Sequence, residues 1–197
     1  MTGVVLAGGK NIRMGRNKAT LPWQQSDFLH VILQRLSSVC SELIVVTNAP
    51  LAIKMANVRS VSDIIPDCGP LSGIHAGLMR ASSPAAFITA CDMPYLQPDA
   101  VAWLSSRLAD WDAVAPDDGF FREPLFACYS RTCIPVIESL LAQGVRKTQT
   151  LFEHIRYHSV PVNDLRQFDP SLRLLQNINA PEDYQRALQN MAGSSVI

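Results

Sequence analysis

Short apolar runs alternate with amphipathic stretches over the first 116 residues of the chain. The runs are apolar throughout, so they predict strands covered on both faces, which is typical of a mainly parallel sheet. Stretches whose apolar residues recur at helical spacing predict helices between these strands. We expect strands at residues 3–6, 43–46, 58–61, 85–89 and 113–115, and helices at residues 28–39 (capped by Asp27), 70–79 and 98–108.

The pattern changes in the second half of the chain. Residues 120–129 mix apolar and polar positions, and they predict an antiparallel ribbon. Residues 134–141 and 148–155 have the spacing of helices. A last helix is expected to begin at Pro181, because proline is favoured in the first turn of a helix.

The expected fold class is α/β, with one mainly parallel sheet and a small antiparallel addition in the C-terminal half. No internal repeat or linker divides the sequence, so we expect a single domain at residues 1–192 and a disordered tail at residues 193–197. A length of 197 residues with 48% hydrophobic content suits one globular domain and argues against a disordered or fibrous chain.

Charge and cysteine content narrow the function classes. Lys and Arg total 17 and Asp and Glu total 17, so the chain lacks the positive charge that drives nucleic-acid binding. No apolar run approaches the roughly 20 residues of a membrane helix, and no basic leader precedes the first strand, so we expect a cytoplasmic protein away from membranes. The five cysteines form no Cys-x-x-Cys pair, which argues against a zinc site and a disulfide framework.

A glycine-rich, basic segment runs from Leu6 to Lys18, directly after the first predicted strand. Its glycines allow close approach of a ligand to the backbone, whose N–H groups bind anions. This combination predicts a phosphate-binding loop, although a solvated surface turn is the alternative. The spacing matches neither a Walker A motif nor a dinucleotide-binding Gly-x-Gly-x-x-Gly motif. Four cations and no acid lie in its last nine residues: Lys10, Arg13, Arg16 and Lys18.

Two aspartates follow predicted strands. Asp92 comes after the strand at 85–89, and ligands of open parallel sheets bind beyond the carboxyl ends of the strands. A carboxylate there can hold Mg²⁺ together with substrate phosphates, and a turn cap is the alternative. Asp63 follows the strand at 58–61 and is expected at the same edge, although an ordinary junction between a loop and a helix would also explain this segment.

Five motifs occur in the chain in one order. They are Leu6-Ala7-Gly8-Gly9 with Arg13-Met14-Gly15 and Lys18, then Gly69-Pro70-Leu71-Ser72-Gly73, Cys91-Asp92-Met93-Pro94, Glu123-Pro124-Leu125-Phe126 and Asn177-Ile178-Asn179-Ala180-Pro181-Glu182-Asp183. With them the chain closely resembles the molybdenum cofactor guanylyltransferase family of MoCo-type nucleotidyltransferases. The resemblance covers nearly the whole sequence, and five ordered motifs are far more specific than one.

The resemblance implies a Rossmann-like, three-layer nucleotidyltransferase fold and the transfer of GMP from GTP to molybdenum-molybdopterin, with Mg²⁺ as cofactor and pyrophosphate as product. It also implies molybdenum-delivering proteins and molybdoenzymes as partner proteins, and we expect a monomer. Asp92 falls at the position of the metal ligand, and Lys18, Arg13 and Asp92 at catalytic positions. Asp67 competes with Asp63 for contact with the nucleotide. The implied GTP-binding residues are Leu6, Ala7, Gly8, Lys18, Asn48, Asp63 and Asp92.

The chemistry of this transfer agrees with the residue types. The attacking phosphate is already anionic, so charge neutralisation and positioning matter more than a general base, and we assign none. Lys18 and Arg13 would stabilise the leaving pyrophosphate. Relatives that transfer CMP carry Ala-Ala-Gly where this chain has Ala7-Gly8-Gly9, which favours GTP here, whereas Asn11 replaces a common serine without changing the expected function.

Three other functions remain as alternatives. They are a cytidylyltransferase that acts on the same cofactor, a nucleotidyltransferase that acts on a sugar phosphate, and a nucleotide-binding module without turnover. Lys18 and Asp92 argue against the binding module, because binding alone has less need of a metal carboxylate.

Overall fold

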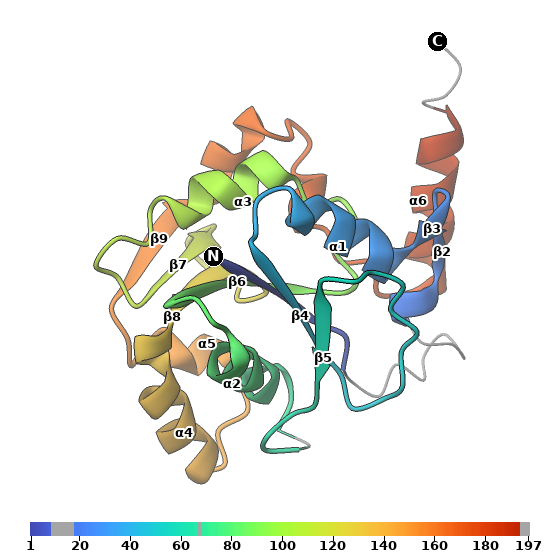
Figure 1. Cartoon of the computed structure of the whole chain (residues 1–197). Coiled ribbons are helices and arrows are strands. Elements are labelled where there is room, and N and C mark those ends of the chain that lie inside the picture. The colour runs from blue at the N-terminus through green and yellow to red at the C-terminus, as the bar shows by residue number, and fades with distance from the viewer. Residues whose placement is uncertain (9–17, 67, 194–197) are drawn as a thin grey trace.

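A seven-stranded sheet forms the centre of the molecule (Figure 1). The computed structural model describes residues 1–8, 18–66 and 68–193, with side chains as far as residue 190. Within these residues the strands lie in the order β5-β4-β1-β6-β8-β7-β9, and β8 alone runs antiparallel to its neighbours. The carboxyl ends of the other six strands therefore lie at one edge. The strands are β1 (Thr2–Leu6), β4 (Glu42–Val46), β5 (Val58–Val61), β6 (Ala85–Ala90), β7 (Ala113–Asp117), β8 (Phe126–Ser130) and β9 (Tyr157–Pro161).

Helices cover both faces of the sheet, which gives three layers (Figure 1). Helices α1 (Phe28–Ser37) and α3 (Pro98–Ser105) pack on one face. Helices α2 (Pro70–Arg80), α4 (Ile134–Ala142) and α5 (Thr148–Leu151) pack on the other. Among the described residues, no helix is long and apolar enough to cross a membrane. Short 3₁₀ helices complete the chain: η2 (Lys18–Thr20), η3 (Arg131–Cys133), η4 (Val162–Gln167) and η5 (Arg173–Leu175).

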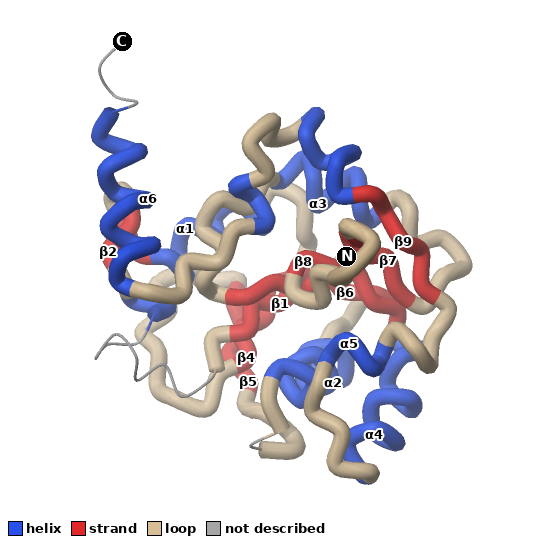
Figure 2. The backbone as a smooth tube through the Cα atoms, turned by 180° about the vertical axis from the view of Figure 1, so that it is seen from behind, coloured by secondary structure: helices blue, strands red, loops and turns tan. Residues whose placement is uncertain are grey.

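The C-terminal helix α6 (Pro181–Gly193) lies beside a small hairpin of β2 (Pro22–Trp23) and β3 (Ser26–Asp27), as Figure 2 shows. A separate apolar cluster that includes Trp23 and Ala187 joins them. The hydroxyl of Tyr184 also donates to the carbonyl of Pro22 at 2.6 Å. This packing brings the start of α6 next to the residues that follow the glycine-rich segment.

Helix α2 approaches β1 unusually closely because glycine faces the strand. A Cβ added at Gly77 would lie 2.6 Å from Cγ1 of Val4, and one at Gly73 would lie 3.1 Å from the methyl groups of Leu6. Side chains other than hydrogen at these positions would push the helix away from the sheet. The two glycines therefore help to set where the first turn of α2 meets the edge of the sheet.

The α/β class, the mainly parallel sheet and the antiparallel addition predicted from the sequence are confirmed. Each predicted strand of the first half is present, and Asp27 caps α1 by accepting from the backbone N–H of His30 at 2.9 Å. The domain limits at 1–192 stay a prediction. Apart from Gly193, which ends α6, the predicted tail at 193–197 lies outside the described residues.

Three elements of the second half differ from the prediction. The helix expected to residue 155 ends at Leu151, because from Phe152 to His154 each backbone N–H donates to the carbonyl three residues earlier rather than four. The ribbon expected from residue 120 begins as a strand only at Phe126. Strand β9 was not predicted, because Val160 is its one fully buried residue and it shows no apolar run.

Candidate active site

Strands β1, β4 and β6 end side by side, and their hydrogen bonds continue one residue beyond each strand. The N–H of Ala7 donates to the last carbonyl of β4 at 2.9 Å, and the N–H of Cys91 donates to the carbonyl of Leu6 at 3.0 Å. These bonds fix the points at which Gly8 and Asp92 leave the sheet. The structure thus brings the start of the glycine-rich segment and Asp92 to the same edge.

Gly8 has open space around it at this edge, as far as the described residues are concerned. A Cβ added there would meet no atom of the described residues within 4 Å, and Gly8 has no positive φ. In this respect Gly8 differs from Gly77, whose contacts leave no room for a side chain. The described protein therefore gives no packing reason for glycine at position 8.

Lys18, Asp92 and Asn179 form a compact cluster at the same edge. The ammonium nitrogen Nζ of Lys18 lies 3.3 Å from Oδ2 of Asp92 and 2.8 Å from Oδ1 of Asn179. The Lys18 side chain is 9% exposed and that of Asp92 17%, so the ion pair is shielded from water. An ammonium group carries three N–H donors, and these two contacts use two of them.

The second carboxylate oxygen of Asp92, Oδ1, is buried and has no hydrogen-bond partner among the described residues. A buried carboxylate oxygen without a donor is costly unless a cation or a ligand meets it. The backbone of Asp92 is fixed, since its carbonyl accepts from the N–H of Ile178 at 2.9 Å, and this bond also places Asn179 beside Lys18.

The Asp92 carboxylate fits a hard divalent cation such as Mg²⁺, which binds oxygen and uses few protein ligands. Among the described residues, no three His, Cys, Asp or Glu side chains gather closely enough to hold a metal ion by themselves. A cation at Asp92 would therefore need water or substrate oxygens to complete its coordination.

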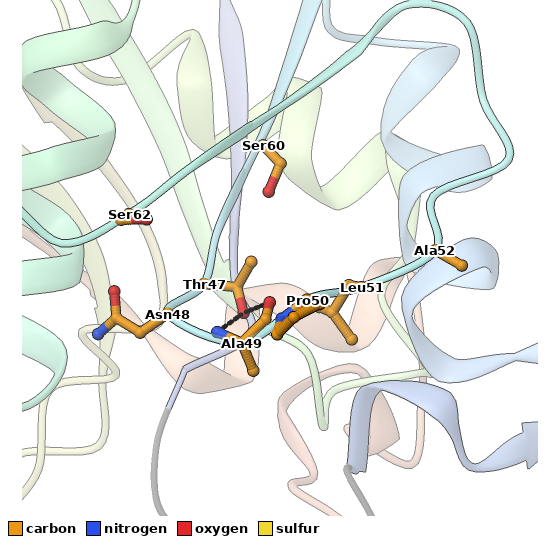
Figure 3. Close-up of a pocket in the computed structure, with 8 residues that line it drawn as sticks. All are labelled: Thr47, Asn48, Ala49, Pro50, Leu51, Ala52, Ser60 and Ser62. Atoms are coloured by element: carbon orange, nitrogen blue, oxygen red, sulfur yellow. Dashed lines mark hydrogen bonds between the residues drawn. The ribbon is translucent and has the colours of Figure 1, made fainter.

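Asn48 and Asp63 also meet, although 15 positions separate them in the sequence. The amide Nδ2 of Asn48 donates to Oδ2 of Asp63 at 2.8 Å, and the backbone N–H of Asp63 donates back to Oδ1 of Asn48 at 3.0 Å. The pair ties the loop after β4 to the loop after β5. It borders an open hollow lined by the turn from Thr47 to Ala52 and by Ser60 and Ser62 (Figure 3).

Glu123 also lies at this edge, although its sequence pattern alone predicts no role for it. Thr89, near the end of β6, pairs with Phe126, the first residue of β8, so the turn that holds Glu123 and the turn that holds Asp92 lie at the same edge of the sheet. Burial raises the pKa of Glu123, and the charge of nearby Asp92 raises it further, while the N–H of Leu125 donates to its Oε1 at 3.2 Å. The motif Glu-Pro-Leu-Phe, which begins with Glu123, is the sequence feature that could have indicated a role for this residue.

Asn179 was not assigned either, although it lies in the last of the five motifs. Its position depends on the packing of α6, which the sequence pattern does not show. Of the predicted site residues, Lys18 meets Asp92 and Asn48 meets Asp63. The predictions for Arg13 and for Asp67 as the alternative to Asp63 lie outside the described residues.

Comparison with known proteins gives one consistent result. A family model described as "MobA-like NTP transferase domain" matches residues 3–160. The molybdenum cofactor guanylyltransferase of Desulfosudis oleivorans is 35% identical over 189 residues, which cover 95% of this chain and 94% of that protein. A probable molybdenum cofactor guanylyltransferase of Pelotomaculum thermopropionicum is 33% identical over 94% of this chain and 91% of its own.

Solved structures agree with the sequence relatives. The crystal structure of molybdopterin-guanine dinucleotide biosynthesis protein A from Archaeoglobus fulgidus has a TM-score of 0.86 at 27% identity, and the match covers 98% of this chain and 100% of that one. The 2-C-methyl-D-erythritol 4-phosphate cytidylyltransferase of Thermus thermophilus has a TM-score of 0.68 at 13% identity, over 91% of this chain and 93% of that one. The second likeness concerns the fold alone.

Proposed function

This chain belongs to the MobA-like NTP transferase family, and we propose that it transfers GMP from GTP to molybdenum-molybdopterin, releasing pyrophosphate. The chain is a nucleotidyltransferase, as its relatives over most of its length are. A 35% identical relative is a molybdenum cofactor guanylyltransferase, which supports GTP and molybdopterin as substrates. The chemistry of the transfer is supported by the shielded cluster of Lys18, Asp92 and Asn179 beside the end of β1. It combines a cation for phosphate with a carboxylate for a metal.

In the proposed reaction, GTP lies over the carboxyl ends of β1, β4 and β5. The backbone of Leu6, Ala7 and Gly8 would line the nucleotide, and the open space at Gly8 supports a close approach. Asn48 and Asp63 would contact it from the neighbouring loops, and their mutual hydrogen bonds hold both side chains in place beforehand.

Lys18 would neutralise charge on the phosphates, with Arg13 as a second cation. The described contacts of the Lys18 ammonium leave one N–H donor for a phosphate oxygen. Its shielding strengthens such a contact, because the same charges interact more weakly in water. Charge that develops on the leaving pyrophosphate is thus met by a cation already in position.

Asp92 would hold Mg²⁺ through Oδ1, the oxygen that lacks a donor. When bound, a divalent cation neutralises phosphate charge and orients the reacting groups. Asn179 keeps Lys18 beside Asp92 while the nucleotide enters. The acceptor's phosphate is anionic near neutral pH, so we assign no residue as a general base.

The acceptor would come from a molybdenum-delivering protein and the product would pass to a molybdoenzyme. The test is pyrophosphate release from GTP, CTP, ATP and UTP in turn, with Mg²⁺ and molybdenum-loaded molybdopterin. Release with GTP alone supports guanylyl transfer. Release with CTP instead would overturn the choice of base, and release with a sugar phosphate as acceptor but not with molybdopterin would overturn the choice of acceptor.

A further inference from the structure

The connection between β7 and β8, residues 118–125, lies at the same edge as Asp92 but away from the proposed nucleotide site. In the sheet order, β6 separates β8 and β7 from β1, β4 and β5. The connection ends beside β6, because Phe126, the first residue of β8, pairs with Thr89 near the end of β6, three positions before Asp92. A second substrate that approaches Asp92 from the side of β8 would therefore meet this connection.

Arg122, next to Glu123, is held in a fixed position. Its Nε donates to the hydroxyl of Tyr157 at 2.8 Å, and that hydroxyl donates to Oδ2 of Asp117 at 3.1 Å. The guanidinium carbon lies 5.0 Å from the centre of the Tyr157 ring. The Arg122 carbonyl also accepts from the side-chain amide of Gln149 at 2.5 Å. Both the backbone and the base of the guanidinium group are thus immobilised.

The outer nitrogens of this guanidinium group remain available for a ligand. Among the described residues, none accepts a hydrogen bond from Nη1 or Nη2 of Arg122, and the side chain is 34% exposed. The nearest acid, Asp117, lies 3.8 Å from Nε and not across the outer nitrogens. A guanidinium group fixed at Nε presents its other N–H groups in the geometry that suits a phosphate oxyanion.

The same connection presents an aromatic ring to solvent. Phe120 is 101% exposed and Phe121 50%. The turn beneath them is ordered, because Oδ1 of Asp118 accepts from the N–H groups of Phe120 at 2.9 Å and Phe121 at 2.7 Å. A ligand with both an anionic group and a flat ring would match what this turn and Arg122 offer.

We propose that Arg122 binds an oxyanion of the acceptor and that Phe120 contacts the acceptor's pterin ring. The inference rests on the proposed function and adds the residues that recognise its second substrate. A sugar phosphate offers an anion but no flat ring, so the two residues together favour a pterin acceptor. Arg122 would bring the acceptor to Asp92 from the side opposite to the nucleotide.

The test compares Arg122→Ala with Arg156→Ala as a matched control. Arg156 is 70% exposed and pairs with Asp112 at 3.5 Å, and both residues directly precede parallel strands, so they lie at the opposite edge of the sheet. For Arg122→Ala, the KM for molybdenum-loaded molybdopterin should rise about tenfold to a hundredfold, the range expected for a hydrogen-bonded charge, with the KM for GTP unchanged. Arg156→Ala should change neither constant.

Equilibrium ultrafiltration without GTP measures acceptor binding directly, so the inference is tested even if no transfer occurs. Failure of transfer by the unaltered protein overturns the proposed function, whereas equal acceptor affinity of the unaltered protein and Arg122→Ala overturns this inference. Arg122→Lys should recover part of the lost affinity. A lower melting temperature of Arg122→Ala with unchanged acceptor affinity would show a purely structural role and would also overturn the inference.

Two further arms identify the contacted groups. Metal-free molybdopterin keeps the phosphate, so an equal loss of affinity for both forms assigns Arg122 to the phosphate, and a loss confined to the loaded form assigns it to the oxygens on molybdenum. Either result supports an anion contact. Phe120→Ala should weaken binding of both forms about threefold or more, and unchanged binding would overturn the ring contact.

Discussion

Lys18 and Asp92 lie 74 positions apart in the sequence, and their side chains meet at 3.3 Å in a shielded ion pair at the carboxyl edge of the sheet. Asn179 joins them through a contact that spans 161 positions. The pair joins the residues that follow the glycine-rich segment in the sequence to the end of β6. We expect the pair to affect both the free energy of unfolding and the turnover of the protein. These two quantities can be measured separately.

Replacing Lys18 by Met should lower both stability and turnover. The variant leaves the Asp92 carboxylate without its cation, and breaking a buried pair costs about 3 kcal/mol in the free energy of unfolding. Lys18→Met/Asp92→Asn should recover part of this loss, because no unpaired charge remains. Urea unfolding of the two single variants and the double variant gives the coupling, and strictly additive effects would contradict a direct interaction.

The same variants test the chemistry. Turnover should fall about a hundredfold or more for Lys18→Met and for Asp92→Asn, as expected when a preorganised charge is removed from a transition state. Asp92→Asn should also need a higher Mg²⁺ concentration for half-maximal rate. Asp112→Asn, at the other edge of the sheet, serves as the control and should leave the Mg²⁺ dependence unchanged. Wild-type turnover in both site variants would refute the assigned roles.

Gly8→Ala should fold as stably as the unaltered protein but bind GTP more weakly. The added Cβ meets nothing within 4 Å among the described residues, so these give no reason for a loss of stability, and a lower GTP affinity would indicate contact with the nucleotide. Gly77→Ala is the matched control, because its Cβ would lie 2.6 Å from Val4 and should cost about 1–3 kcal/mol of stability. Thermal melts and GTP titrations separate the effects. Unchanged GTP affinity of Gly8→Ala would show that the nucleotide does not approach this backbone.

Asn48→Ala and Asp63→Ala should each raise the KM for GTP about threefold to tenfold with little change in turnover, since these side chains are proposed to bind the nucleotide rather than the reacting atoms. Because the two side chains hydrogen-bond to each other, the double variant should lose less than the product of the single losses. Steady-state kinetics with GTP varied measures this coupling. A fall in turnover at unchanged KM would argue for a different role.

Stability should depend on pH through Glu42, which is far from the proposed site. Burial alone would raise the pKa of Glu42, but hydrogen bonds from Thr2, Ser82 and Arg59 outweigh it and lower the pKa to about 2. A lowered pKa in the folded state stabilises the protein above the ordinary value of 4.5, and this contribution is lost as the pH falls from there towards 2. The stability difference from Glu42→Gln should therefore shrink over this range, as urea unfolding at several pH values would show. A difference independent of pH would contradict the assignment.

The sequence predicted the sheet in its first half well, because β1, β4 and β6 are continuous apolar runs, whereas β9 is a parallel edge strand with Val160 as its one fully buried residue. The ends of strands also predicted where Asp92 and Asp63 lie. What could not be predicted depends on packing between distant segments.

Asn179 reaches Lys18 because α6 packs on the small hairpin near Trp23, and no local pattern encodes that contact. Glu123 lies near Asp92 because β8 pairs with β6 and begins beside the end of that strand, a pairing that a mixed pattern of apolar and polar residues does not fix. Both residues lie within recognisable sequence motifs, but only the folded structure shows which residues they contact.

Transfer of GMP to molybdopterin can be followed with GTP labelled at the α-phosphorus, incubated with the protein, Mg²⁺ and molybdenum-loaded molybdopterin. We expect the label in a pterin product, in equal amount to the pyrophosphate released, and a labelled product that forms about a hundredfold more slowly, or slower still, when Asp92→Asn replaces the unaltered protein. Label that stays in GTP, or that appears as free GMP or GDP, would contradict guanylyl transfer to this acceptor.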